Sequence, residues 1–167
     1  MIVLVMGVSG SGKTTIGERL AARLGCGFSD ADQFHSPANK AKMSRGIALT
    51  DADRQPWLLA IRAAMDEQRR QGRDHVFACS ALKRRYRELL RGADDDLRLV
   101  YLQGPPDLLA RRLRQRTGHF FAPELLADQL ATLEPPNPGE ALVMDIRQPP
   151  EVIVERIAEA LGSPPMR

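Results

Sequence analysis

The stretch Gly7-Val-Ser-Gly-Ser-Gly12-Lys13-Thr14 decides the fold. It matches the pattern G-x-x-x-x-G-K-[ST] at every fixed position, directly after an apolar run and at the start of a helical pattern. In such a loop the glycines let the backbone curl, so that its N–H groups surround a chain of phosphates. A glycine- and serine-rich turn that carries a lysine by chance is the alternative, and the flanking strand and helix argue against it. The stretch therefore predicts a phosphate-binding loop.

This loop supplies most of the predicted nucleotide contacts. The Lys13 ammonium would lie on the β- and γ-phosphate oxygens, and the Thr14 hydroxyl is suited to Mg²⁺. The helix that follows would add the positive end of its dipole. The candidate ATP-binding residues of the loop are Gly7, Ser9, Gly10, Ser11, Gly12, Lys13, Thr14 and Thr15.

Outward from the loop, short apolar runs alternate with longer amphipathic segments. The apolar runs predict strands over residues 2–6, 26–30, 75–79, 97–102 and 142–146. The segments with helical spacing predict helices over residues 13–24, 38–43, 51–71, 81–90, 105–116, 123–133 and 150–161. Strands that alternate with helices favour a parallel sheet with right-handed crossovers. We expect an α/β fold of the P-loop type, with a five-stranded parallel sheet flanked by helices.

The bulk composition fits one globular domain over residues 1–167, without an internal linker. The net charge is +3, from 24 basic and 21 acidic residues that are interspersed, which two anionic ligands explain as well as nucleic acid does. With few aromatic residues for stacking, we expect no nucleic-acid binding. The apolar run at residues 2–6 is too short to span a bilayer, and Cys26 and Cys79 lack metal-ligand spacing. These features predict a soluble, cytoplasmic protein with free thiols.

Two carboxylates follow the second predicted strand. Ligands of open α/β sheets bind at the carboxyl ends of the strands, so Asp30 and Asp32 would face the phosphates. Asp30 would then lie near Mg²⁺, and Asp32 near the substrate hydroxyl as a base or as an orienting group. An aspartate after a strand is also a common turn former or helix cap. The spacing alone leaves both interpretations open.

Four further blocks resemble the gluconokinase family, in that family's order. They are Asp30-Ala-Asp-Gln-Phe-His35 with Asn39 and Lys42-Met43, then Leu49-Thr-Asp-Ala-Asp-Arg54-Gln-Pro-Trp57-Leu58, Cys79-Ser-Ala-Leu-Lys83-Arg-Arg-Tyr86-Arg87, and Arg116-Thr-Gly-His119-Phe120. The blocks cover essentially the whole chain. The resemblance implies ATP- and Mg²⁺-dependent phosphorylation of D-gluconate at its 6-hydroxyl, a fold like that of nucleoside-monophosphate kinases, and a homodimer. It also implies a substrate-binding segment at about residues 32–60 and a lid at about 116–123.

The chemistry of a linear sugar acid suits the residues in these blocks. Its carboxylate needs a cation, for which Arg54, Lys83 and Arg87 are candidates. Lys83 and Arg87 are four residues apart, so on a helix they would share a face, although a solvated basic face is the alternative. Trp57 is expected to anchor the core beneath this segment. The remaining candidate substrate-binding residues are Asp32, His35, Lys42, Asp51, Ser80 and His119.

The arginines before and at the start of the predicted lid compete for two roles. Arg116 is the best candidate for a catalytic arginine, which would stabilise negative charge on the transferred phosphoryl group. By analogy with shikimate kinases, Arg112 would lie on one face of adenine, and Gln148 and Pro149 would cover the other. A basic helix face that only aids solubility is the alternative.

Two other functions compete with gluconate phosphorylation. A kinase for another hydroxy acid, such as shikimate or a related aldonate, would share the loop and the paired carboxylates. The glycine-rich stretch that shikimate kinases carry after the third strand is replaced here by Cys79-Ser-Ala-Leu-Lys83. A protein that uses ATP only as a switch would not need the paired carboxylates or the lid arginines.

Overall fold

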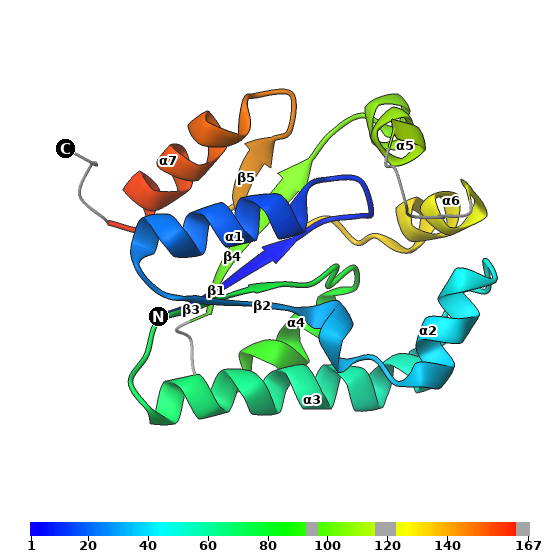
Figure 1. Ribbon diagram of the computed structural model, residues 1–167, viewed down its shortest axis with the longest axis horizontal. Coiled ribbons are helices and arrows are strands. Elements are labelled where there is room, and N and C mark those ends of the chain that lie inside the picture. Colours follow the sequence, from blue (N-terminus) through cyan, green and yellow to red (C-terminus); the bar gives the residue numbers. More distant parts are fainter. Residues whose placement is uncertain (93–96, 116–122, 163–167) are drawn as a thin grey trace.

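The computed structural model describes residues 1–92, 97–115 and 123–162 (Figure 1). Five strands pair in the order β2-β3-β1-β4-β5, and every pairing is parallel. The strands are β1 (Ile2–Met6), β2 (Gly27–Asp30), β3 (His75–Ala78), β4 (Leu97–Gln103) and β5 (Leu142–Asp145). The helices are α1 (Lys13–Leu24), the 3₁₀ helix η1 (Ala31–Phe34), α2 (Pro37–Ser44), α3 (Asp51–Arg70), α4 (Arg84–Arg91), α5 (Pro106–Gln115), α6 (Pro123–Thr132) and α7 (Pro150–Ala160). The predicted α/β fold with a five-stranded parallel sheet is confirmed.

The central strand β1 is apolar throughout because both of its faces are buried. Successive side chains of a strand point to opposite faces of the sheet. Val3 and Val5 accordingly pack in one apolar cluster with α1 and α7, and Ile2, Leu4 and Met6 pack in another with α3 and α4. Figure 1 shows the same division, with α1 and α7 on one side of the sheet and α3 and α4 on the other. The two clusters hold the sheet rigid beneath the loops at its edge.

The strand order places the phosphate-binding loop at the point where ligands bind in this class of fold. From β1 the chain first builds β2 and β3 on one side and then β4 and β5 on the other. A crevice opens at the carboxyl ends of the strands where the winding direction changes. The loop at residues 7–12 leaves β1 at this crevice, and α2 and α6 lie near the same edge (Figure 1).

Two local features differ from the predicted elements. Helix α4 begins at Arg84 rather than at residue 81, because Ala81 has a φ of 46° and Lys83 is extended with φ −102° and ψ 146°. The 3₁₀ helix η1 was not predicted. It begins after Asp30, whose side chain caps it by accepting a hydrogen bond from the Asp32 N–H. None of the described helices combines the length and the apolar character needed to cross a membrane.

Candidate functional site

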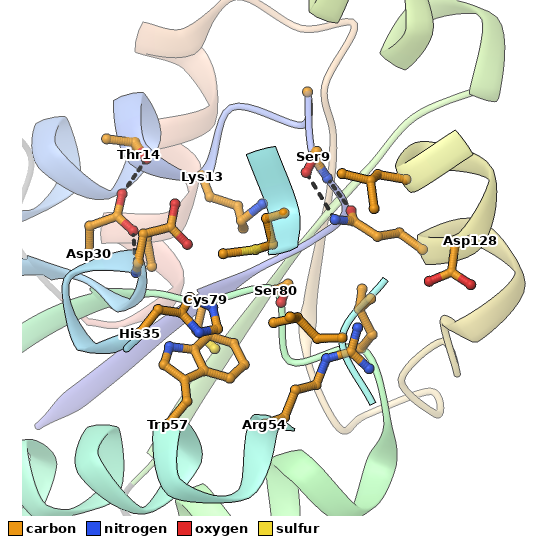
Figure 2. Close-up of a pocket in the computed structure, with 18 of the residues that line it drawn as sticks. Ser9, Lys13, Thr14, Asp30, His35, Arg54, Trp57, Cys79, Ser80 and Asp128 are labelled. Atoms are coloured by element: carbon orange, nitrogen blue, oxygen red, sulfur yellow. Dashed lines mark hydrogen bonds between the residues drawn. The ribbon is translucent and has the colours of Figure 1, made fainter. Parts of the chain in front are cut away.

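A cleft of about 340 Å³ opens at the carboxyl ends of the strands (Figure 2). The phosphate-binding loop, the ends of β2 and β3, and helices α2, α3 and α6 all contribute side chains to it. Its polar and charged lining residues are Ser9, Lys13, Thr14, Asp30, Asp32, His35, Ser44, Arg54, Ser80, Asp128 and Gln129. The structure therefore brings together predicted residues from the phosphate-binding loop and from three of the four further sequence blocks.

The phosphate-binding loop keeps its shape through glycine. Gly10 has a φ of +86°, and a Cβ added there would lie 2.9 Å from the Leu109 carbonyl oxygen. A side chain at this position would therefore meet both backbone strain and a backbone clash. Lys13 lines the cleft, and its ammonium donates to the Val8 carbonyl of the same loop at 3.2 Å.

Thr14 and Asp30 meet beside the loop. The Thr14 hydroxyl donates to Asp30 Oδ2 at 2.6 Å, and the Asp32 N–H donates to Asp30 Oδ1 at 2.9 Å (Figure 2). A hydroxyl and a carboxylate are both oxygen ligands of the kind that Mg²⁺ takes, and Mg²⁺ usually completes its shell with water and phosphate. No group of three or more metal-binding side chains occurs among the described residues, so a cage made of protein alone is not built there. The donor set fits a Mg²⁺ ion that arrives with a phosphate ligand.

His35 lies in the floor of the cleft against Trp57. The two rings stack with centroids 4.1 Å apart and an interplanar angle of 12°, and the Trp57 indole N–H donates to the Ala31 carbonyl at 2.8 Å. The His35 side chain is buried, and its Nδ1 has no hydrogen-bond partner within the described part of the chain. Burial lowers the pKa of His35 to about 4, and the charge of Arg54 adds to the effect. The imidazole is therefore neutral at physiological pH, and Trp57 is the core anchor that the sequence predicts.

Beside the cleft, Asp51 in the first turn of α3 forms ion pairs with basic side chains. Its carboxylate accepts from the Lys83 ammonium at 3.1 Å and also binds the Arg85 guanidinium and the Tyr86 hydroxyl. The Tyr86 hydroxyl in turn accepts from Arg54 Nη1 at 3.1 Å. Arg54 lines the cleft, whereas Asp51 and Lys83 lie next to it, outside its described lining. The predicted cations Arg54 and Lys83 thus belong to one charged cluster at the mouth of the cleft.

Lys42 reaches the start of α3 rather than the cleft. Its ammonium donates to both carboxylate oxygens of Asp53, at 2.9 and 3.1 Å. Asp53 also closes a capping box with Thr50, and the pKa of its carboxyl is lowered by the Thr50 backbone N–H first and by Lys42 next. In this arrangement Lys42 ties α2 to α3, and a role in substrate binding stays a prediction.

The structure places Arg87 outside the cleft, which departs from its predicted role as a carboxylate ligand. The side chain is buried, and its guanidinium donates to the carbonyls of Ala81, Leu82 and Glu134 and to the Glu140 carboxylate. The bonds to Ala81 and Leu82 hold the turn between β3 and α4, and those to Glu134 and Glu140 tie α4 to the segment between α6 and β5. Because Lys83 precedes the helix rather than lying on it, the expected shared face of Lys83 and Arg87 is also absent.

A smaller hollow of about 180 Å³ lies on the other side of the phosphate-binding loop. The Arg112 guanidinium crosses it and donates to the Ile146 carbonyl at 2.7 Å. Pro149, the N-cap of α7, is not among the residues that line the hollow, but it directly precedes the lining residue Pro150. The lining consists of Ser11, Gly12, Thr15, Ile16, Arg112, Ile146, Gln148, Pro150 and Ile153. Arg112 and Gln148, which were predicted to cover adenine, are therefore brought together.

Helix α6 contributes residues that the sequence analysis missed. Leu125, Asp128 and Gln129 line the cleft, and the Gln129 side chain hydrogen-bonds to Ser9 of the phosphate-binding loop. No motif marks these positions, and the only signal was polar residues within the apolar pattern of that helix. The catalytic candidate Arg116, the candidate His119 and most of the predicted lid lie outside the described residues.

Comparison with known proteins agrees with this geometry. The family model for shikimate kinase matches residues 9–161. The chain is 48% identical to a probable gluconokinase of Dictyostelium discoideum, over 94% of this chain and 84% of that protein. It is 47% identical to a gluconokinase of Gluconobacter oxydans, over 93% of this chain and 88% of that protein. The chain belongs to the gluconokinase family.

A solved structure of similar sequence shares this fold. The unliganded crystal structure of a sugar kinase from Janibacter sp. HTCC2649 is 48% identical and superposes with a TM-score of 0.91, covering 96% of this chain and 94% of that chain. The predicted resemblance is confirmed.

Proposed function

We propose that the protein is a gluconokinase, which transfers the terminal phosphoryl group of ATP to the 6-hydroxyl of D-gluconate. The observation that carries this proposal is the cleft itself. It joins the phosphate-binding loop, the paired carboxylates Asp30 and Asp32, and the cation Arg54 in one space of about 340 Å³. The named gluconokinase relatives support the choice of gluconate among sugar acids.

The smaller hollow and the cleft would bind different substrates. Adenine fits the smaller hollow beside Arg112 and Gln148, and the phosphates then run along the loop toward Lys13 and Thr14 in the cleft. Gluconate would enter from the α3 side, with its carboxylate toward Arg54 and the neighbouring Lys83. Its far hydroxyl would then approach the terminal phosphate.

Asp32 is the residue that we assign to the attacking hydroxyl. It is exposed at the start of η1 and lines the cleft beside Lys13. In phosphoryl transfer a carboxylate at this place accepts the hydroxyl proton or orients the oxygen for in-line attack. The neutral His35, fixed by Trp57, is suited to hydrogen-bond a substrate hydroxyl without adding charge.

Thr14 and Asp30 would hold Mg²⁺ together with the ATP phosphates. A bound Mg²⁺ neutralises charge that develops on the phosphate oxygens during transfer. We also propose, from the family resemblance, that the protein is a homodimer, and from its two free cysteines that it works in the reducing cytoplasm.

A coupled ADP-release assay tests the proposal. The substrates would be ATP and Mg²⁺ with D-gluconate, shikimate, other aldonates or nucleoside monophosphates. Turnover confined to gluconate is the expected result, and Asp32→Asn should then lower kcat by about 100-fold or more with little change in ATP affinity. Asp128→Asn, an acidic cleft residue without an assigned role, is the matched comparison. Turnover with another acid, or with none, would overturn the gluconate assignment.

A further inference from the structure

Gln129 of α6 holds Ser9 of the phosphate-binding loop through both ends of its side-chain amide. The Ser9 N–H donates to Gln129 Oε1 at 2.7 Å, and Gln129 Nε2 donates to Ser9 Oγ at 3.1 Å. Figure 2 draws both bonds as dashed lines at Ser9, in the cleft. The two residues are 120 positions apart in the chain, so the contact joins two separate elements. Neither bond is required to close a helix or a strand.

Ser9 lies on the side of the loop where the terminal phosphate would be. Ser11, Gly12 and Thr15 line the smaller hollow with Arg112, whereas Ser9 lines the cleft. Gly12 lines both spaces, so the phosphate chain would pass from one to the other along the loop. A nucleoside in the smaller hollow would therefore present its last phosphate to the cleft, on the side of Ser9.

The Ser9 N–H can serve only one strong acceptor at a time. Backbone N–H groups of this kind of loop bind phosphate oxygens, and Gln129 Oε1 now fills that position at 2.7 Å. A phosphate oxygen carries charge and makes a stronger hydrogen bond than a neutral amide oxygen. ATP can therefore displace the Gln129 oxygen, but it has to break the contact in order to bind.

We propose that Gln129 determines how strongly the nucleotide site favours ATP over ADP, by competing with the terminal phosphate for the Ser9 N–H. This inference rests on the proposed use of ATP. The two hydrogen bonds of Gln129 tie α6 to the loop. The terminal phosphate releases that tie, and ADP, which lacks this phosphate, leaves it in place. Helix α6 also places Leu125 and Asp128 in the cleft, so the tie to Ser9 bears on their position beside the transferred phosphoryl group.

Equilibrium binding of two nucleotides tests this competition without turnover. The ligands are ADP and the analogue of ATP with a β,γ-imido bridge, each with Mg²⁺, measured by titration calorimetry. Gln129→Leu keeps the size of the side chain and removes both hydrogen bonds. Loss of one competing hydrogen bond should tighten the analogue about two- to tenfold, while the Kd for ADP stays within about twofold. Glu124→Gln, an exposed change on the same helix, is the control and should alter neither Kd.

A double-mutant cycle with Ser9→Ala separates the competition from a structural role. Ser9→Ala keeps the N–H and loses the hydroxyl, so in the Gln129→Leu background it should leave the ratio of the two Kd values unchanged. If Gln129→Leu changed the Kd values of both nucleotides equally, or changed neither, Gln129 would only pack α6. Weaker binding of the analogue would make Gln129 a phosphate ligand and overturn the competition. Absence of any analogue binding by the unmodified protein would instead reject the proposed kinase function, and this inference with it.

Discussion

At the scale of single residues, the environment of His35 has a consequence for stability. Its ring stacks on Trp57 and is buried in the floor of the cleft, and burial lowers its pKa from an ordinary 6.5 to about 4. The unfolded chain therefore binds a proton at His35 at a higher pH than the folded protein does. The stability that depends on a neutral His35 is complete above pH 6.5 and is lost as the pH falls toward 4.

We expect the free energy of unfolding to fall by about 2 kcal/mol more between pH 7.5 and pH 5 in the unmodified protein than in His35→Gln. Urea unfolding at the two pH values measures this difference. His75, whose pKa is also lowered by burial, is present in both proteins and cancels in the comparison. Parallel pH dependence in the two proteins would show that His35 is already charged, or accessible, in the folded state.

Arg87 shows why residue type and spacing were insufficient to assign a binding role. The pattern placed it beside Lys83 on one helix face, and both are cations. The fold instead uses its guanidinium to satisfy carbonyls of the turn in which Ala81 has a φ of 46°, together with Glu134 and Glu140. Which backbone carbonyls need a donor depends on the conformation of that turn, and this conformation is not encoded in the periodicity.

At the scale of elements, the N-terminus of α3 links helix capping to the substrate end of the cleft. Thr50 accepts a hydrogen bond from the Asp53 N–H, and the Asp53 carboxylate accepts from the Thr50 N–H. Asp51 and Arg54, which belong to the charged cluster at the cleft mouth, are in the same first turn. The cap therefore fixes residues that we assign to gluconate.

Thr50→Ala should destabilise the protein by about 1 kcal/mol, because one N-cap hydrogen bond is lost. It should also raise the KM for gluconate, because Arg54 lies in the turn that the cap fixes. The KM for ATP should stay unchanged, because Thr50 does not line the smaller hollow assigned to adenine. Thr50→Ser, which keeps the hydroxyl, is the matched control. Thermal unfolding and steady-state kinetics on the three proteins measure both effects. A rise in the ATP KM, or stability equal to that of Thr50→Ser, would contradict the link.

The elements themselves were largely predictable, for a physical reason that β1 illustrates. An apolar run such as Ile2–Met6 has to be buried on both faces, and a buried parallel strand requires covering helices. Contacts between distant elements were less predictable. Nothing in the sequence near residue 129 indicates that Gln129 meets Ser9, because the contact depends on how α6 lies across the loop. His35, Arg54 and Ser80, which line the cleft together, were predicted as substrate-binding residues because the blocks that contain them resemble the gluconokinase family.

At the scale of the whole molecule, the loop at residues 7–12 divides the nucleotide end from the substrate end. The smaller hollow with Arg112 opens between the loop and the β5–α7 connection, whereas the cleft with Arg54 opens toward α2 and α3. The hollow-lining residues Ile16, Ile146 and Ile153 pack in the cluster around α1 and α7, whereas α3, which carries Arg54, packs in the cluster around α3 and α4. A change at Arg54 therefore has little reason to reach the smaller hollow through the packing of α3.

Arg112→Ala and Arg54→Ala should consequently affect different substrates. The first should raise the KM for ATP about tenfold and leave the gluconate KM unchanged, since a stacked or hydrogen-bonded guanidinium is lost beside adenine. The second should raise the gluconate KM by a similar factor and spare ATP, with Arg54→Lys restoring part of the loss if charge matters more than the planar fork. Initial rates over a grid of both substrate concentrations measure the four values. If either variant raised both KM values together, the loop would not divide the site, and the assignment of adenine to the smaller hollow would have to be abandoned.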